Sequence, residues 1–112
     1  MVKKTYIPNQ GDIIYANFME EFGHEQWGRR PALVLSNIIY NKITEMAIVA
    51  PITSKDKNFP FHVKIYEHKI KGVAMCEQVR AIDCAKREIE FVEKVNSRTL
   101  FEVKSIIENF IE

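Results

Sequence analysis

The sequence predicts one α+β domain, a compact β-barrel followed by an amphipathic helix. Three observations support this prediction. The chain has 112 residues, a length that suits a single domain covering residues 1–112. Several short segments rich in β-branched and aromatic residues are separated by glycine, proline and polar turns. The last segment, residues 97–111, instead repeats its apolar residues at the spacing of one helix face.

Six segments have the composition and length of β-strands. They cover residues 12–18, 32–36, 46–52, 61–66, 73–82 and 90–95. In the fourth segment apolar and polar residues alternate, so Phe61, Val63 and Ile65 are expected on the core face. His62 and Lys64 are then expected on the opposite, polar face.

The connections and the helix termini complete the expected fold. Residues 19–31 form a polar loop that is longer than most connections in compact domains, which favours a functional role. Residues 37–44 are typical of a turn or a single helical turn. The final helix has two candidate caps, either Ser97 or a capping box formed by Thr99 and Glu102.

The charge balance argues against a strongly basic protein that coats nucleic acid. Lysine and arginine number 16, and aspartate and glutamate number 15, so the formal net charge is +1. Basic residues nevertheless cluster at 29–30, 55–57 and 64–71, and acidic residues gather toward the C-terminal end. A basic groove with an acidic back fits this distribution. From charge alone, an ordinary charged surface is the simpler interpretation.

The sequence indicates neither a cofactor nor a membrane segment. Cys76 and Cys84 form no C-x-x-C motif, and the histidines and cysteines lack metal-ligand spacing. No glycine-rich nucleotide loop is present. The start has no signal-peptide pattern, and no apolar run approaches the roughly 20 residues of a membrane span. We therefore expect a cytoplasmic protein without a metal ion or cofactor.

The first polar loop contains the groups needed to cleave RNA without a metal ion. Such cleavage requires a base for the 2′-hydroxyl, an acid for the leaving oxygen and donors for the charge on phosphorus. His24 and Glu25 are candidates for proton transfer, and Arg29 and Arg30 are forked phosphate donors. Trp27 offers a ring on which a base can stack. Taken alone, the loop is equally consistent with a charged surface loop.

Residues later in the chain offer weaker candidates. The hydroxyls of Thr53 and Ser54 can bind a phosphate, and the lysines that follow, Lys55 and Lys57, can attract the RNA backbone. A strand-end turn explains these residues as well. His62 is either a proton donor or an inert surface histidine. Gln78 either reads a base edge or satisfies a hydrogen bond in the core.

Several blocks together resemble toxins of the MazF/PemK type, in the order and at the spacing of that family. They cover most of the chain, and each block alone would be weak. The blocks are Gly11-Asp12, Glu25-Gln-x-Gly-x-Arg-Pro31 leading into Ala32-Leu-Val-Leu-Ser-Asn37, Pro51-Ile-Thr-Ser54, Phe59-Pro-Phe-His-Val63, and Gly72-Val with Gln78-Val-Arg80.

The resemblance implies a fold, an activity and two kinds of partner. The fold would be an SH3-like barrel that forms a homodimer. The activity would be a sequence-specific endoribonuclease that cleaves single-stranded RNA and halts translation. Its products would carry a 2′,3′-cyclic phosphate, or a 3′-phosphate, and a 5′-hydroxyl. The second partner would be an antitoxin whose disordered tail lies along the RNA site.

The resemblance assigns Arg30, Thr53 and Glu25 to catalysis. An arginine with a pKa above about 12 is a poor general base, so Arg30 is expected to stabilise the transition state and Glu25 to act as the base. Thr53 would position the scissile phosphate. The PemK branch has an Arg-x-Asp pair where this chain has Met75-Cys-Glu77, so that arginine is missing and Glu77 is a distant candidate. The residues expected to bind RNA are His24, Gln26, Trp27, Arg29, Ser54, Lys55, His62 and Gln78.

Two alternatives compete with an RNA-cleaving enzyme. One is a non-catalytic toxin that binds DNA gyrase, built on the same barrel and similar to CcdB. The block from Glu25 to Pro31 argues against it, because a gyrase binder has no need for that loop. The other alternative is an RNA-binding module without activity.

Overall fold

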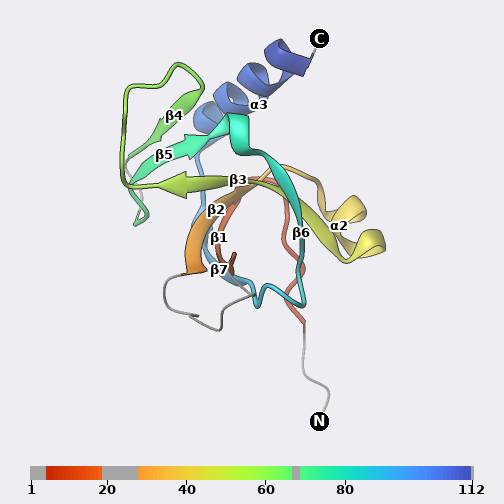
Figure 1. Ribbon diagram of the computed structural model, residues 1–112. Helices are drawn as coiled ribbons and strands as arrows, with labels where there is room; N and C mark the ends of the chain where they lie inside the picture. Colours follow the sequence, from red (N-terminus) through yellow and green to blue (C-terminus); the bar gives the residue numbers. More distant parts are fainter. Residues whose placement is uncertain (1–4, 19–27, 67–68, 112) are drawn as a thin grey trace.

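The strands form one curled antiparallel sheet, and the C-terminal helix covers one face of it (Figure 1). The structure is a computed structural model that describes residues 5–18, 28–66 and 69–111. The predicted α+β class, a barrel-like sheet with a terminal helix, is confirmed. The elements are β1 (Asp12–Asn17), β2 (Arg29–Val34), α2 (Ile38–Thr44), β3 (Met46–Thr53), β4 (His62–Ile65), β5 (Gly72–Met75), the 3₁₀ helix η2 (Cys76–Gln78), β6 (Arg80–Asp83), β7 (Glu90–Lys94) and α3 (Ser97–Ile111).

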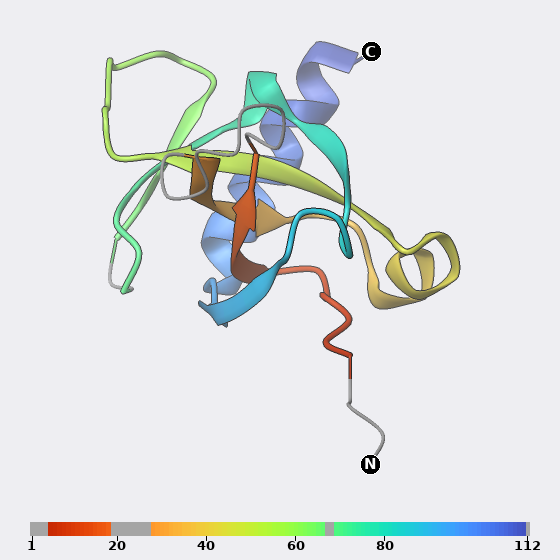
Figure 2. The same cartoon turned by 60° about the horizontal axis from the view of Figure 1, so that its bottom comes forward.

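β3 is the strand that joins the two halves of the sheet. The hydrogen-bonded order is β4-β5-β3-β2-β1-β7, and β6 pairs with the first half of β3. β3 pairs with β2 over Val49–Pro51, whereas its last two residues, Ile52 and Thr53, pair with β5. The end of β3 therefore projects away from β1 and β2 toward β4 and β5 (Figures 1 and 2). Thr53 lies at the junction of the two halves.

Alternating residues along the strands build a core on each face of the sheet. On the face toward α3, Ile13 and Leu33 pack in one cluster with Val103 of the helix. Their strand neighbours Ile14 and Val34 belong to a second buried cluster on the opposite face. Burying an aliphatic side chain of this size contributes about 1.5–3 kcal/mol, so β1 and β2 are held from both sides. β2, which is fixed in this way, begins with the two candidate arginines, Arg29 and Arg30.

The C-terminal helix has the predicted bounds but a different cap. α3 spans Ser97–Ile111. The side chain of Asn96 accepts a 2.8 Å hydrogen bond from the Thr99 backbone N–H, so the caps predicted from Ser97 and from Thr99 with Glu102 are wrong. Asn96, which precedes Ser97, caps the helix by accepting from the Thr99 N–H, one of the N–H groups in the first turn that have no partner within the helix. In the described part of the chain, no helix is long and apolar enough to cross a membrane.

The segment at 37–44 forms a longer helix than predicted. α2 has seven residues, Ile38–Thr44, where a turn or a single helical turn was expected. Asn37 caps it by accepting a 3.0 Å hydrogen bond from the Tyr40 N–H. Glu45 ends it in the left-handed conformation, with φ of 59°. The Asn37 cap can be read from the sequence, whereas a glutamate at position 45 is not the glycine or asparagine that usually signals such an end.

The single strand predicted at 73–82 is interrupted in its middle. β5 and β6 both run antiparallel to β3, but the residue pairs Ile52↔Ala74 and Ala47↔Ile82 differ in register by three residues. The three residues of η2 take up this difference. Residues 72–83 therefore pair with both ends of β3: β5 pairs with its last two residues and β6 with its first four. Gln78 consequently lies on a 3₁₀ helix, and the prediction that it lies in a strand is wrong.

The alternation predicted around β4 is correct only from Val63 onward. Val63 and Ile65 are buried and Lys64 is exposed, as expected. Phe61 is 38% exposed and its ring packs against Phe110 of α3, so the prediction that it faces the core is wrong. β4 begins only at His62, so the alternation does not extend back to the preceding residue. The expectation of a solvent-facing His62 is also wrong, because its side chain is only 8% exposed.

Candidate functional site

A hollow of about 300 Å³ lies where β3 ends and β4 begins. We call it the β3–β4 groove. Four of the predicted catalytic and RNA-binding residues meet in it, although they come from separate segments of the chain: Thr53, Lys55, His62 and Gln78. Its lining residues are Thr53, Lys55, Lys57, Phe59, His62, Met75, Glu77 and Gln78. The groove therefore combines a hydroxyl, two ammonium groups, an imidazole, a carboxylate and an amide.

Thr53 is held at the last residue of β3 by contacts on both sides. Its hydroxyl oxygen accepts a 3.2 Å hydrogen bond from the Lys55 N–H, which turns the chain out of the strand. Across the sheet Thr53 pairs with Val73. A Cβ on the neighbouring Gly72 would lie 2.3 Å from the Thr53 carbonyl oxygen, so glycine is required for this close approach of the two backbones. These contacts give the hydroxyl a defined position at the groove.

His62 and Glu77 form a pair inside the groove. The pairing of β4 with β5 sets His62 opposite Met75, two residues before Glu77. The His62 Nε2 lies 3.1 Å from a Glu77 carboxylate oxygen, and the imidazole makes an edge contact with the Phe59 ring at 5.1 Å. Within the described residues, the buried Nδ1 of His62 has no hydrogen-bond partner.

This geometry selects one tautomer of His62. A proton on the buried Nδ1 would be a donor without an acceptor, which costs about 1–3 kcal/mol. The Glu77 carboxylate can only accept, so the hydrogen bond between the two side chains requires the proton on Nε2, which donates to Glu77. His62 thus acts as a hydrogen-bond donor that orients the Glu77 carboxylate.

The two adjacent arginines have different surroundings. Arg29 donates to the Glu88 carbonyl and pairs with the Glu90 carboxylate, both at 2.8 Å, which directs it toward β7. Arg30 is exposed, and among the described residues its guanidinium has no hydrogen bond or ion pair. Successive side chains of a strand point to opposite faces, so the two guanidinium groups separate. Only Arg30 keeps its donors available.

Arg30 lies at the same end of the sheet as Thr53 but outside the lining of the groove. The β2–β3 ladder begins at the pair Ala32↔Pro51. Arg30 and Thr53 each lie two residues beyond that pair, at the point where the two strands diverge (Figure 1).

Four predicted site residues cannot be placed. His24, Glu25, Gln26 and Trp27 lie outside the described residues, so their roles stay predictions. Of the other predicted RNA-binding residues, Lys55 and Gln78 are exposed at the groove, and Ser54 is exposed beside it.

Sequence reasoning underestimated Glu77 and gave no role to Phe59 and Met75, which also line the groove. Glu77 was only a distant candidate, because nothing in the local sequence links it to His62, fifteen positions earlier. The sequence did contain one indication, because Glu77 is adjacent to Gln78, which was already a candidate for RNA binding. In the part of the chain that the structure describes, no group of three histidine, cysteine, aspartate or glutamate side chains could hold a metal ion.

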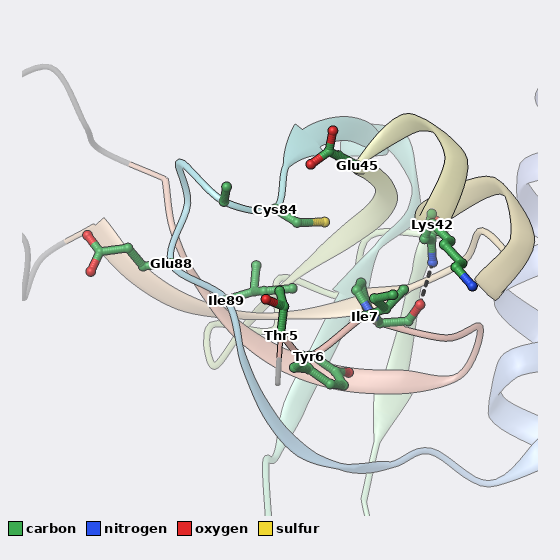
Figure 3. Close-up of a pocket in the computed structure, with 11 residues that line it drawn as sticks. Thr5, Tyr6, Ile7, Lys42, Glu45, Cys84, Glu88 and Ile89 are labelled. Carbon is green, nitrogen blue, oxygen red and sulfur yellow. Dashed lines mark hydrogen bonds between the residues drawn. The ribbon is translucent and has the colours of Figure 1, made fainter. Parts of the chain in front are cut away.

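A second hollow, of about 410 Å³, lies away from the groove, between the N-terminal segment, α2 and residues 84–89 (Figure 3). Its wall is mostly apolar, and burial raises the pKa values of Tyr6 and Cys84 there. Its charged lining residues are one lysine, Lys42, and two glutamates, Glu45 and Glu88. This net negative lining disfavours a polyanion, in contrast to the β3–β4 groove with its two lysines.

The fold and the groove define a small barrel-like domain that presents a basic, hydroxyl-containing groove at the end of its central strand. Solved structures share this architecture. MazF from Deinococcus radiodurans is 34% identical, with a TM-score of 0.86 over 96% of this chain and 98% of that chain. A MazE–MazF structure from the same organism is 33% identical, with a TM-score of 0.87 over 95% of this chain and 97% of that chain.

The sequence comparisons identify the family. The family described as "PemK-like, MazF-like toxin of type II toxin-antitoxin system" matches residues 9–111. The endoribonuclease toxin MazF of Escherichia coli K12 is 42% identical over 77 residues, which is 69% of each chain. The endoribonuclease EndoA of Bacillus subtilis is 39% identical over 83 residues, covering 69% of this chain and 72% of the relative. The chain belongs to the PemK-like, MazF-like toxin family.

Proposed function

We propose that this protein is an endoribonuclease toxin that cleaves single-stranded RNA at the β3–β4 groove, in a sequence-specific manner, and thereby inhibits translation. The observation that carries the proposal is the groove itself, where the Thr53 hydroxyl, Lys55 and Lys57 surround a space suited to a phosphate. The relatives named above are endoribonucleases, which favours RNA cleavage over gyrase binding.

The proposed reaction is an internal transesterification. A base removes the proton of a 2′-hydroxyl, the 2′-oxygen attacks phosphorus, and the bond from phosphorus to the 5′-oxygen breaks. The leaving 5′-oxygen takes up a proton, which gives a 2′,3′-cyclic phosphate and a 5′-hydroxyl. Because the nucleophile belongs to the substrate, no metal-bound water is needed to generate it. The reaction therefore does not require a metal ion.

Three residues carry the chemistry in this proposal. Arg30 stabilises the charge that develops on the phosphate, because its guanidinium offers two donors in one plane. Thr53 positions the scissile phosphate from the end of β3. Glu25 is the proposed base. His24, Gln26 and Trp27, from the same loop as Glu25, bind the RNA together with Arg29, Ser54, Lys55, His62 and Gln78.

The cleavage chemistry can be tested with purified protein and single-stranded RNA in excess EDTA. We expect cleavage to continue at an undiminished rate, and we expect the new 5′ ends to accept phosphate from a kinase without prior phosphatase treatment. The control is the variant Arg30→Ala, prepared identically, which excludes a contaminating nuclease. Loss of cleavage with EDTA and its recovery with magnesium would show that the mechanism is wrong.

We further propose that the protein is a symmetric dimer whose RNA site is formed by the loops 19–31 and 53–60. A domain of this size buries only about two-thirds of its unfolded surface. Large apolar side chains are also exposed on both helices, including Ile43 at 78% and Phe101 at 71%. Sedimentation at micromolar concentration should give twice the mass of one chain. A fully active monomer would contradict this proposal.

The proposed partner in the cell is an antitoxin whose disordered tail lies along the RNA site. Membership of a type II toxin–antitoxin family supports this partner, as do the solved MazE–MazF structures of Deinococcus radiodurans. Lys55 and Lys57 would attract acidic residues in such a tail.

A further inference from the structure

Arg80, the first residue of β6, carries a guanidinium group that the proposed cleavage chemistry does not use. The side chain is exposed, and its guanidinium carbon lies 5.4 Å from the centre of the Phe18 ring. We propose that Arg80 binds the RNA backbone, at a phosphate next to the one that is cleaved, and that Phe18 holds it in place. This inference rests on the proposed RNA cleavage and adds a binding residue to that site.

The first step of the argument is that the donors of Arg80 are available. A guanidinium has five N–H donors, and in the part of the chain that the structure describes no hydrogen bond or ion pair occupies those of Arg80. Arg29, in contrast, is bound to Glu88 and Glu90. The Phe18 ring attracts the cation and restricts where it lies, but it offers no conventional acceptor for the N–H groups. Arg80 therefore keeps its donors for a ligand.

The second step is that Arg80 projects from the same face of the sheet as Thr53. Arg80 lies opposite Val49 of β3, and residues directly opposite each other on antiparallel strands share a face. Val49 belongs to the buried cluster on the face away from α3. Thr53 follows Val49 by four residues of β3, so the alternation of side chains places it on that face as well. Its neighbour Ile52 packs in the other cluster, as this alternation requires.

The third step is that Phe18 is next to Arg30 as well as Arg80. Arg30 lies opposite Ala16, which belongs to the same buried cluster, so Arg30 also projects from the face away from α3. The Phe18 N–H continues the β1–β2 ladder by donating to the Gly28 carbonyl, which makes Phe18 a diagonal neighbour of Arg30, at about 7–8 Å. β6 and β1 are not adjacent in the sheet, so it is the curl of the sheet that brings Arg80 to Phe18 (Figure 1).

The fourth step is that two arginines without a carboxylate partner indicate an anionic ligand. Within residues 5–18, 28–66 and 69–111, neither Arg30 nor Arg80 forms an ion pair. Gathering like charges on one face is unfavourable, and a bound anion offsets this cost. Guanidinium groups match the oxygens of a phosphate with paired N–H donors. Since Arg30 is proposed to bind the scissile phosphate, Arg80, held at the Phe18 ring, is suited to a neighbouring phosphate of the same strand.

The test measures single-turnover cleavage of a single-stranded RNA over a range of protein concentrations and at several salt concentrations. Arg80→Gln should raise the half-saturating protein concentration roughly tenfold, while the rate at saturation stays within about threefold of the wild-type rate. Loss of one phosphate contact should also reduce the slope of log affinity against log salt concentration by about 0.7. Arg80→Lys keeps the positive charge, so it should weaken binding less and retain the wild-type slope.

Two further variants and one measurement on the unaltered protein separate RNA binding from packing. Arg98→Gln makes the same chemical change at an exposed position of α3, on the other face of the sheet, and should leave affinity and slope unchanged. Phe18→Leu removes the ring but not the charge of Arg80, so it should weaken binding about threefold and keep the slope. In the wild-type protein, RNA with methylated 2′-hydroxyls, which cannot be cleaved by transesterification, should protect Arg80 but not Arg98 from modification by phenylglyoxal.

The assignment of Arg80 to the RNA backbone is supported by a reduced salt slope for Arg80→Gln together with protection of Arg80 by RNA. An unchanged slope, or an Arg80 that reacts equally with and without RNA, would overturn it. A fall in the saturating rate at unchanged affinity would overturn it too, because Arg80 would then act in the chemistry. If Arg80→Gln does not fold, the protection measurement on the wild-type protein decides. A wild-type protein whose Arg80 is protected by RNA but which cleaves none would overturn the proposed function and leave the binding assignment intact.

Discussion

Replacing Arg30 by lysine is expected to slow single-turnover RNA cleavage almost as much as replacing it by alanine. Stabilising the charged transition state requires two donors fixed in a plane, and an ammonium group offers one mobile point charge. Loss of one preorganised donor typically costs about 3–4 kcal/mol, or roughly a hundred- to thousandfold in rate. Arg30 is exposed and has no partner among the described residues, so either substitution should leave the fold intact.

The matched control is Arg29→Lys, at the adjacent position. Arg29 pairs with Glu90 on the surface, and a lysine keeps that charge. Exposed pairs of this kind contribute about 1 kcal/mol or less, so the rate should change little. Single-turnover cleavage should be measured for all three variants, with circular dichroism to confirm that each is folded. A nearly normal rate for Arg30→Lys would show that Arg30 contributes only its positive charge and does not stabilise the transition state through two planar donors.

Replacing Gly72 by alanine is expected to damage both stability and cleavage. The added Cβ would lie 2.3 Å from the Thr53 carbonyl oxygen and 2.9 Å from its carbonyl carbon, so the backbones of β3 and β5 must separate. Gly72 also has φ of 149°, a conformation that other residues rarely adopt. Together these effects should cost about 2–4 kcal/mol. They should also displace Thr53, the residue proposed to position the phosphate.

The control for this substitution is Gly11→Ala. Gly11 also has a positive φ, of 93°, but a Cβ there would meet only the Leu100 side chain, at 3.6 Å. It should therefore lose about 1–2 kcal/mol through backbone strain alone and keep its cleavage rate once folded. Urea unfolding and single-turnover rates below the unfolding transition separate the two effects. A Gly72→Ala protein as stable and active as Gly11→Ala would contradict the steric argument.

The spacing of apolar residues predicted an element correctly where the position of that element did not depend on pairing with a distant strand. The apolar spacing at 97–111 placed α3 correctly, because one helix face packs through Val103 onto the sheet. The predictions failed where two segments had to fit each other. The strand expected at 73–82 is broken by η2, since the two ends of the segment pair with β3 in registers that differ by three residues. The register between two strands that are distant in the sequence cannot be predicted from the residues of either strand alone.

The structure brings four of the predicted site residues together, and their roles stay predictions. Thr53, Lys55, His62 and Gln78 were candidates on chemical grounds, and all four line the β3–β4 groove. The two arginines could not be told apart by composition, because both offer the same guanidinium. Their separation comes from the direction of successive side chains on β2 and from the Glu90 carboxylate on β7.

The sequence by itself determined the class of fold, the family and the chemical groups available for RNA cleavage. The fold class follows from hydrophobic periodicity and the chemical groups from residue types at short spacing, which are local properties of the chain, whereas the family follows from the resemblance of several blocks to known toxins. Only the tertiary structure decided that His62 is buried and donates to Glu77, and that Gly72 must be a glycine beside Thr53. Both depend on contacts between strands far apart in the sequence. Strand pairing brings such residues together, and burial then determines which of their atoms can meet a ligand.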